Sequence, residues 1–196
     1  MQRIIFASGN NGKVKEVRHI MANLDMQILS LSDIDFTGNI EETGSTFEEN
    51  AKIKAEEIYK KYKLPTIADD SGLVVEQLNG EPGIYSARYS GEDATDKKNN
   101  QKLIGKLKEF NKPHNAKFVC AAVFYDGKNF STAFGEVKGE VIYEERGTNG
   151  FGYDPIFVPD GFEKTMAELE PEIKNKISHR YNAFSKLKKI LAEKSD

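Results

Sequence analysis

Two long strand patterns surround a single turn signal in the middle of the chain, and this arrangement constrains the fold more than any other feature. The segment KFVCAAVFYDGKNFSTAFGEVKGEVI, residues 117–142, is rich in apolar residues on both sides of Asp126-Gly127. An Asp-Gly pair between two such runs is typical of a β-hairpin. The segment therefore predicts two antiparallel neighbouring strands, so the sheet that contains them is not purely parallel.

Elsewhere the chain alternates between strand patterns and helix patterns. Short apolar runs predict strands, and apolar residues at helical spacing after a capping residue predict helices. The expected strands are 3–7 and 66–78, and the expected helices are 14–24, 46–63 with Ser45 or Thr46 as cap, 94–110 with Thr95 as cap, and one from about Ser178. We therefore expect an α/β fold with a central mixed β-sheet flanked by helices.

Length and charge limit the class of protein. The length allows one well-buried core, so we expect residues 1–196 to form a single domain. A net charge of −3 gives no overall field for DNA or RNA, so no nucleic acid polymer is expected as a partner. The apolar run after Arg3 is too short for a signal peptide or a membrane span, which predicts a cytoplasmic protein without a membrane partner. The single cysteine, Cys120, excludes an internal disulfide and lies in an apolar run where we expect burial.

The loop between the first strand and the first helix has the features of an anion site. A helix N-terminus presents backbone N–H groups and favours negative charge. Glycines give a phosphate close access, serine and asparagine offer neutral hydrogen bonds, and a lysine adds charge in the first turn. The residues are Ser8, Gly9, Asn10, Asn11, Gly12 and Lys13. Their spacing differs from that of a P-loop, and an ordinary Asn/Gly turn with an exposed lysine is the alternative.

Acidic residues occur at two places that suit a metal or an acid–base site. Glu41 and Glu42 lie just before the second helix, and Asp69 and Asp70 interrupt the second strand pattern. A buried carboxylate needs a cation or hydrogen-bond donors. Because successive side chains of a strand alternate between faces, we expect only one of the two aspartates to face the site. Capping of the following turn by both acids is the alternative.

Lys54 lies at the margin of the apolar stripe of the second helix, beside Ala51, Ala55 and Ile58. Such a lysine more often extends past the edge of the core into water. A site with acids alone would repel a polyphosphate, however, and a site that used only lysines to bind phosphate would have no need of the acids. A magnesium ion with oxygen ligands explains why both residue types are present, so we expect Mg²⁺ as the cofactor.

A glycine-rich stretch and the start of the last helix form the final candidate region. Phe151 and Tyr153 lie between glycines, where a flat ring has room to stack. Lys174, His179 and Arg180 lie near the start of the last helix, and Arg180 can donate to a carbonyl of a base. A serine cap followed by exposed polar residues is the alternative. The three histidines of the chain are far apart in sequence and predict no zinc site.

Together, these motifs resemble those of the inosine/xanthosine triphosphate pyrophosphatase family. The motifs, in order, are SGNNGK, EETGSTFEENAKIKA, IADDSGL, PGIYSARYSG, GFGYDP and ISHR, and they span the chain from Ala7 to Arg180. The resemblance implies magnesium-dependent hydrolysis of non-canonical purine nucleoside triphosphates, namely ITP, dITP and XTP, to the monophosphate and pyrophosphate. It also implies a homodimer and an elongated two-lobed fold with the active site in the cleft between the lobes.

The resemblance also implies roles for individual residues. It makes Asp70 the proton acceptor for water and a metal ligand together with Glu41, with Glu42 nearby. Lys54 and Lys174 match phosphate-binding lysines, and Ser71 matches a substrate contact. The phosphate loop and the base pocket complete the substrate-binding set: Ser8, Gly9, Asn10, Asn11, Gly12, Lys13, Phe151, Gly152, Tyr153, Asp154, His179 and Arg180. Tyr153 stands where some members carry tryptophan, and Arg88 lies in a matched segment without an assigned role.

Two other functions remain open from the sequence. A pyrimidine nucleoside triphosphate pyrophosphatase of related fold would use similar parts, and release of pyrophosphate from ITP against dTTP would separate the two. A non-catalytic nucleotide sensor would need the cationic loop but would gain little from Glu41 and Asp70. Tight magnesium-dependent binding without turnover would support the sensor.

Overall fold

The computed structural model of the chain describes residues 2–22 and 24–193 as a mixed six-stranded sheet with helices. The strand order is β2-β1-β3-β4-β5-β6, in which β1 pairs in parallel with β2 and β3, and β5 pairs antiparallel with β6. The elements are β1 (Gln2–Phe6), α1 (Asn11–Met21), β2 (Met26–Ser30), η1 (Ser32–Ile34), α2 (Phe47–Tyr62), β3 (Thr66–Val75), η2 (Glu76–Leu78), η3 (Gly83–Arg88), α3 (Asp96–Leu107), β4 (Asn115–Tyr125), β5 (Phe130–Val141), η4 (Asp154–Ile156), β6 (Phe157–Pro159), α4 (Pro171–Ile177) and α5 (His179–Glu193). The expected mixed α/β fold is confirmed.

Contacts divide the chain into two compact units, and the strands β3, β4 and β5 contribute residues to both. Unit 1 consists of Met1–Asp70, Cys120–Gly135 and Arg180–Asp196, and unit 2 consists of Ser71–Val119 and Glu136–His179. Each unit has its own buried apolar side chains, since every core cluster draws its residues from one unit alone.

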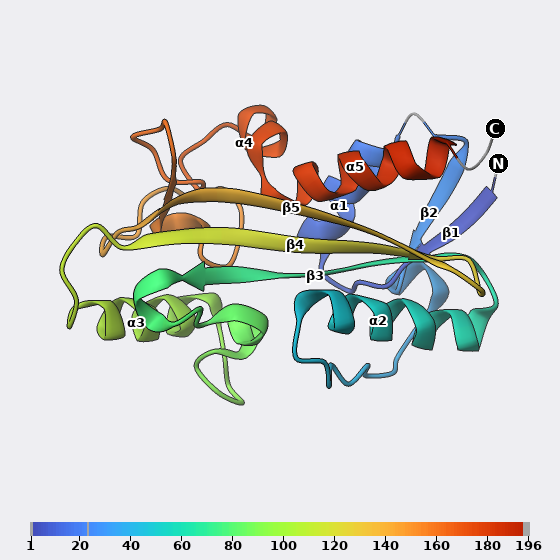
Figure 1. Ribbon diagram of the computed structural model, residues 1–196, viewed down its shortest axis with the longest axis horizontal. Coiled ribbons are helices and arrows are strands. Elements are labelled where there is room, and N and C mark those ends of the chain that lie inside the picture. The colour runs from blue at the N-terminus through green and yellow to red at the C-terminus, as the bar shows by residue number, and fades with distance from the viewer. Residues whose placement is uncertain (1, 23, 194–196) are drawn as a thin grey trace. The chain divides into compact units, whose positions relative to one another are not determined.

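In unit 1, helices cover both faces of the sheet, with α1 and α5 on one side and α2 on the other (Figure 1). Ile4 and Phe6 join a cluster with residues of α1 and α5, whereas Ile5 joins a second cluster with Ala51, Ala55 and Ile58 of α2. Period-two alternation along the strand therefore sends alternate residues to opposite helical layers. The same alternation continues in β3, where Ile67 belongs to the first cluster and Ala68 to the second.

In unit 2, a single cluster is built around α3 and the second halves of the long strands. Leu103 and Leu107 of α3 are fully buried in it together with Leu73 of β3 and Phe157 of β6. Tyr153, which precedes η4, also belongs to this cluster. The core of unit 2 thus reaches the glycine-rich stretch that the sequence marked as a candidate site.

Local sequence signals explain the helix starts. The side chains of Asn10, Thr46 and Thr95 each accept a hydrogen bond from the backbone N–H three residues later. Such a cap stabilises a helix by about 1 kcal/mol. Thr46 rather than Ser45 is the cap of α2, and Glu49 completes it by accepting from the backbone N–H and the hydroxyl of Ser45.

The hairpin and most other elements agree with the sequence, whereas two short strands, one short α-helix and the 3₁₀ turns were not predicted. β4 and β5 are sheet neighbours joined through Asp126, whose Oδ1 accepts from the backbone N–H groups of Lys128 and Asn129 at 2.7 Å each. Cys120 is buried, as expected. Among the strands and α-helices, those without a sequence prediction are β2, β6 and α4, which have five, three and seven residues and weak periodic signals.

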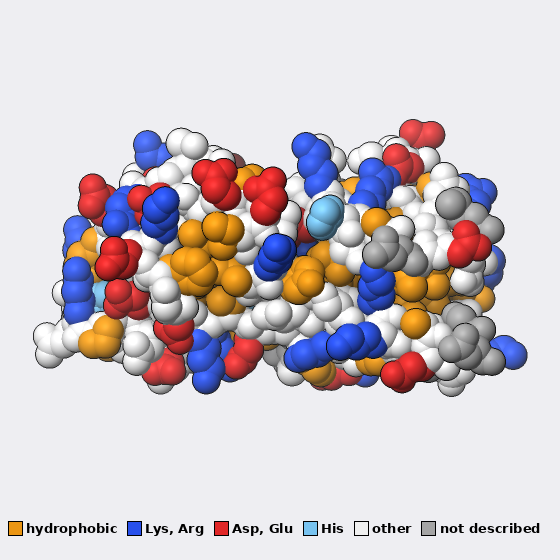
Figure 2. Space-filling model, turned by 90° about the horizontal axis from the view of Figure 1, so that it is seen from above, with side chains coloured by type: hydrophobic (Ala, Val, Ile, Leu, Met, Phe, Trp, Pro, Cys, Tyr) orange, Lys and Arg blue, Asp and Glu red, His pale blue; other side chains and the backbone are white. Residues whose placement is uncertain are grey.

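On the surface, Lys and Arg side chains are interspersed with Asp and Glu over the face that Figure 2 presents. This mixture agrees with the small net charge of −3. Among the described residues, no helix is both long and apolar enough to cross a membrane.

Candidate functional site

The loop from β1 to α1 is exposed, and its own hydrogen bonds cap the start of α1. Asn10 accepts from the backbone N–H of Lys13 at 3.1 Å, and its own N–H donates to the hydroxyl of Ser8 at 3.2 Å. A Cβ added at Gly9 would meet no atom within 4 Å, so this side of the loop is open. Lys13 lies in the first turn of α1, as predicted, and its side chain is half-buried. The loop can therefore present N–H groups and a lysine to an anion.

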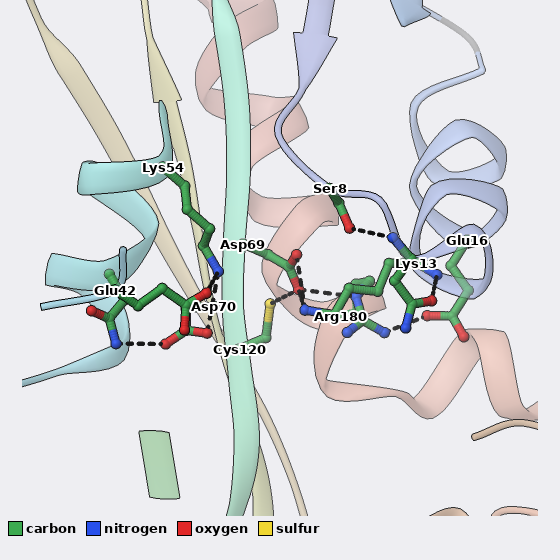
Figure 3. Close-up of polar contacts among 11 residues, drawn as sticks. Ser8, Lys13, Glu16, Glu42, Lys54, Asp69, Asp70, Cys120 and Arg180 are labelled. Atoms are coloured by element: carbon green, nitrogen blue, oxygen red, sulfur yellow. Dashed lines mark hydrogen bonds and ion pairs between the residues drawn. The ribbon is translucent and has the colours of Figure 1, made fainter. Parts of the chain in front are cut away.

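Asp69 lies at the centre of an ion-pair network in unit 1 (Figure 3). Its carboxylate is 3.1 Å from Lys13 Nζ and 3.2 Å from Arg180 Nε, and the thiol of Cys120 donates to it at 3.9 Å. Burial raises the pKa of the Asp69 carboxyl, but the charges of Lys13, Arg180 and Lys54 outweigh this effect and hold the pKa below its ordinary value. Asp69 is therefore a compensated buried anion.

Asp70 belongs to a different set of residues on the α2 side of β3 (Figure 3). Its Oδ1 is 3.3 Å from Lys54 Nζ, and its Oδ2 accepts from the side chain of Asn50 at 3.2 Å. Lys54 Nζ also lies 2.9 Å from Glu42 Oε1, so two carboxylates share one ammonium group. Burial raises the pKa of Asp70, and the attraction of Lys54 does not outweigh burial together with the repulsion of Glu42. Asp70 is thus poised to accept a proton or a further cation.

Lys54 is buried rather than extended into water. Its side chain is 11% exposed, and it projects from α2 toward the strand (Figure 3). Burial lowers the pKa of Lys54, but the nearby carboxylates of Asp70, Asp69 and Glu42 raise it above its ordinary value, so the side chain stays charged. The alternative of a lysine that reaches past the core edge does not hold for this residue.

The two consecutive glutamates before α2 differ in their surroundings. Glu41 is exposed, whereas Glu42 is half-buried and bonded to Lys54. The structure therefore brings Glu42, rather than Glu41, to Asp70. Within residues 2–22 and 24–193, no group of three or more His, Cys, Asp or Glu side chains is arranged to hold a metal ion. A pair of carboxylates fits magnesium, which is commonly held by one or two carboxylates together with substrate phosphates and water.

Arg180 is buried and committed to carboxylates of unit 1. Its side chain is 2% exposed, with Nε at 3.2 Å from Asp69 and one terminal nitrogen at 2.7 Å from Glu16 Oε2. Burial lowers the pKa of Arg180, and the charges of Asp69 and Glu16 more than offset that effect. Its expected contact with a base carbonyl stays a prediction. No local pattern predicts the pairing with Glu16, because the two residues lie 164 positions apart.

In unit 2, Asp154 organises the glycine-rich stretch. Its Oδ2 accepts from the backbone N–H of Phe151 at 2.9 Å and lies 2.7 Å from Lys174 Nζ. The Lys174 ammonium is 5.2 Å from the centre of the Phe151 ring, and its side chain is 9% exposed. Lys174 therefore holds Asp154 and the Phe151 ring in place, and its predicted contact with phosphate stays a prediction.

The aromatic residues of this region have different environments. Phe151 is half-buried, whereas Tyr153 is only 4% exposed and its hydroxyl donates to the backbone carbonyl of Ser86 at 2.8 Å. The structure thus leaves the Phe151 ring, and not the Tyr153 ring, accessible for stacking. His179 is buried with its ring stacked on Phe118, at 4.8 Å between ring centres and 13° between planes.

The predicted site residues form two sets, one in each unit. Unit 1 holds the Ser8–Lys13 loop, Glu41, Glu42, Lys54, Asp69, Asp70 and Arg180, and unit 2 holds Ser71, the 151–154 stretch, Lys174 and His179. The chain joins the sets directly at Asp70–Ser71 and at His179–Arg180.

Arg88 is exposed and lies 5.4 Å from the ring centre of Tyr85. The contacts of Asn50 with Asp70 and of Glu16 with Arg180 were not predicted, since the partners lie 20 and 164 positions apart in the sequence.

Known proteins match this chain along nearly its whole length. The model of the Ham1 family matches residues 4–190. The dITP/XTP pyrophosphatase of Bacillus subtilis (strain 168) is 49% identical over 97% of this chain and 98% of its own length. The protein of the same name from Oceanobacillus iheyensis is 44% identical over 97% and 98% of the two chains. The structure of a HAM1 protein from Coxiella burnetii superposes with a TM-score of 0.91 at 40% identity, covering 98% of this chain and all of that one.

Proposed function

The chain belongs to the Ham1 family, and on this premise we propose that it hydrolyses the non-canonical purine nucleoside triphosphates ITP, dITP and XTP to the monophosphate and pyrophosphate. It is a nucleoside triphosphate pyrophosphatase that acts on the anhydride between the α and β phosphates. The observation that carries the proposal is the Asp70–Lys54–Glu42 group, in which two carboxylates share one buried ammonium. Such an arrangement suits a reaction that needs both a base and phosphate-binding cations.

Unit 1 binds the triphosphate in this proposal. The Ser8–Lys13 loop contributes N–H groups and the Lys13 ammonium, and Lys54 contributes a second charge. Lys174, which the resemblance assigns to phosphate, lies in unit 2 beside Asp154. The ammonium groups of Lys13 and Lys54 stabilise the charge that develops on the departing pyrophosphate.

Asp70 orients or deprotonates the attacking water. A carboxylate with a raised pKa is a stronger base than an ordinary one, and burial gives Asp70 that property. Mg²⁺ would be held by Asp70 and Glu42, in place of the pair Asp70 and Glu41 that the resemblance implies. When bound, the ion supplies charge neutralisation for the phosphate oxygens.

Unit 2 binds the base. The half-buried Phe151 ring offers a stacking surface, and Gly152, Tyr153, Asp154 and His179 surround or support it. Donors from the backbone of 151–154 would meet the carbonyl of a 6-oxo purine, whereas the amino group of adenine would leave them without acceptors. A mismatch of this kind is worth on the order of 10⁴-fold in discrimination.

We also propose that the protein acts as a cytoplasmic homodimer, which follows from the family resemblance. Its substrate is then a free nucleotide, so that neither a nucleic acid polymer nor a membrane takes part in the reaction. Size-exclusion chromatography with light scattering tests the dimer, and a monomer at micromolar concentration would contradict it.

A panel of nucleoside triphosphates with Mg²⁺ tests the function. We expect pyrophosphate from ITP, dITP and XTP, and far less from ATP and dTTP. Orthophosphate as the first product would mean attack at the outer phosphorus and would contradict the proposal. Preferred hydrolysis of dTTP would instead indicate a pyrimidine enzyme, and tight binding without turnover would indicate a sensor.

A further inference from the structure

We propose that Asp96 and Asn100 of α3 are positioning residues that hold the 151–154 loop in the conformation that selects the base. The inference rests on the proposed function, because it concerns the base-binding part of the same site. Neither residue belongs to the set that the sequence assigned to substrate or metal. Both residues and the loop lie in unit 2.

The two side chains hold both backbone groups of Gly152. Asp96 Oδ2 accepts from the backbone N–H of Gly152 at 2.7 Å, and Asn100 Nδ2 donates to the carbonyl oxygen of Gly152 at 3.2 Å. Asp96 and Asn100 are four residues apart on a helix, so they lie on one face. The contacts fix the peptide groups on both sides of Gly152, whose φ of +63° is in the left-handed region. The helix therefore sets the backbone direction at the centre of the loop.

The identity of Asn100 indicates a role beyond packing. Asn100 is 2% exposed and lies on the same helical stripe as the fully buried Leu103 and Leu107. Its Oδ1 is buried and has no hydrogen-bond partner within the part of the chain that the structure describes. An apolar residue would suit this stripe better, because a buried acceptor without a donor is unfavourable. What asparagine provides here is the bond from Nδ2 to Gly152.

A neighbouring residue connects the same helix to the other end of the loop. Asn99 donates to the carbonyl oxygen of Ser86 at 3.3 Å and accepts from the backbone N–H of Ser90 at 2.8 Å. The hydroxyl of Tyr153 donates to that same carbonyl of Ser86. Within the loop, Phe151 N–H is held by Asp154. α3 thus supports the loop at Gly152 directly and at Tyr153 through Ser86.

This support predicts a specific kinetic defect. The reacting phosphates are assigned to unit 1 and the base to the loop, so release of the loop weakens base recognition and leaves the chemical step intact. A preformed loop binds its ligand more tightly than one that must order on binding. Loss of the Asp96 or Asn100 bond should therefore raise KM and reduce discrimination among bases, with little change in kcat.

The test uses Asp96→Ala, Asp96→Asn, Asn100→Leu and the control Gln101→Ala in the full chain, with kcat and KM measured for ITP and ATP. Gln101 is exposed and adjacent to Asn100. We expect Asp96→Ala and Asn100→Leu to raise KM for ITP about tenfold and to lower the ITP-to-ATP ratio of kcat/KM, since one such bond is worth about a factor of ten. Asp96→Asn keeps an acceptor for Gly152 N–H and should restore most of the ratio, and Gln101→Ala should match the wild type.

Thermal unfolding separates positioning from stability. Asn100→Leu continues the apolar stripe and should unfold at or above the wild-type temperature, so its higher KM would not reflect a damaged fold. If the wild type is active but Asp96→Ala and Asn100→Leu both keep its KM and its ITP-to-ATP ratio of kcat/KM, this inference is wrong while the proposed function stands. A kcat that falls in these two variants by the same factor as KM rises would overturn it as well. A wild type that releases no pyrophosphate from ITP would overturn the proposed function, and this inference with it.

Discussion

Asp69 and Asp70 are consecutive residues of β3, yet their side chains point to opposite faces of the strand (Figure 3). Asp69 faces α1 and α5 and is neutralised by Lys13 and Arg180. Asp70 faces α2 and shares Lys54 with Glu42. Asp69 is thus a compensated buried anion, whereas Asp70 is the carboxylate that we propose as the base.

Asp70→Asn should remove turnover without loss of the fold. Loss of a general base lowers kcat by about 10²–10⁴-fold. Burial and Glu42 both disfavour the charged form of Asp70, so a neutral amide should leave the temperature of thermal unfolding unchanged or higher. Pyrophosphate release from ITP and a thermal melt are the measurements. Turnover close to that of the wild type would exclude Asp70 from the mechanism.

Glu42→Gln and Glu41→Gln form a matched pair that identifies the metal ligand. Because Glu42 contacts Lys54 and Glu41 is exposed, we expect Glu42→Gln to need at least tenfold more Mg²⁺ for half-maximal turnover, in line with the loss of one carboxylate bond. Glu41→Gln should keep the wild-type requirement. Removal of Mg²⁺ with EDTA should abolish turnover in all three proteins. If Glu41→Gln needs more Mg²⁺ and Glu42→Gln keeps the wild-type requirement, the metal ligand is Glu41.

Asp69→Asn should destabilise the protein, because it removes the buried carboxylate beside Nε of the buried Arg180. Breaking a buried pair in this way lowers the free energy of unfolding by about 3–5 kcal/mol. The folded-state pKa of Asp69 is below its unfolded value of about 3.9, so its contribution is present above that pH and is lost as pH falls through the folded-state pKa.

Urea unfolding at pH 7 and pH 3 measures both effects. The difference in stability between the wild type and Asp69→Asn should be full at pH 7 and smaller at pH 3. Glu16→Gln is the control, since Glu16 is 14% exposed and leaves Asp69 in place beside Arg180. A stability difference that is equal at the two pH values would show that the charge of Asp69 is not what stabilises the fold.

Gly150→Ala should weaken ITP binding more than Gly152→Ala. Both glycines have positive φ, at +86° and +63°, so both alanines introduce similar backbone strain of about 1 kcal/mol. Only at Gly150 would the added Cβ meet other groups, at 2.1 Å from Asp154 Oδ2 and 2.6 Å from Lys174 Nζ, and nothing lies within 4 Å at Gly152. Thermal melts and KM for ITP compare the two. Equal effects would mean that the Asp154–Lys174 contact does not shape the base site.

Local signals in the sequence determined most of the elements. The apolar periods defined β1, α1, α2, β3 and α3, threonine and asparagine caps defined the helix starts, and Asp126-Gly127 defined the hairpin. These features depend on residues a few positions apart, which is the range over which a helix or turn closes its hydrogen bonds. The alternation rule also gave the opposite orientations of Asp69 and Asp70.

Only the tertiary structure decided which partners these residues have. Packing of α5 and α2 on the sheet brings Arg180 to Asp69 and Lys54 to Asp70, from positions 111 and 16 residues away. Tertiary packing also decided that Glu42 and not Glu41 contacts Lys54, and that Tyr153 is buried. It likewise brings α3 to Gly152, whose partners on that helix are 52 and 56 residues away. A sequence pattern gives the face on which a side chain lies, but the group opposite that face is set by how distant segments pack, and the charge of each carboxylate depends on that packing.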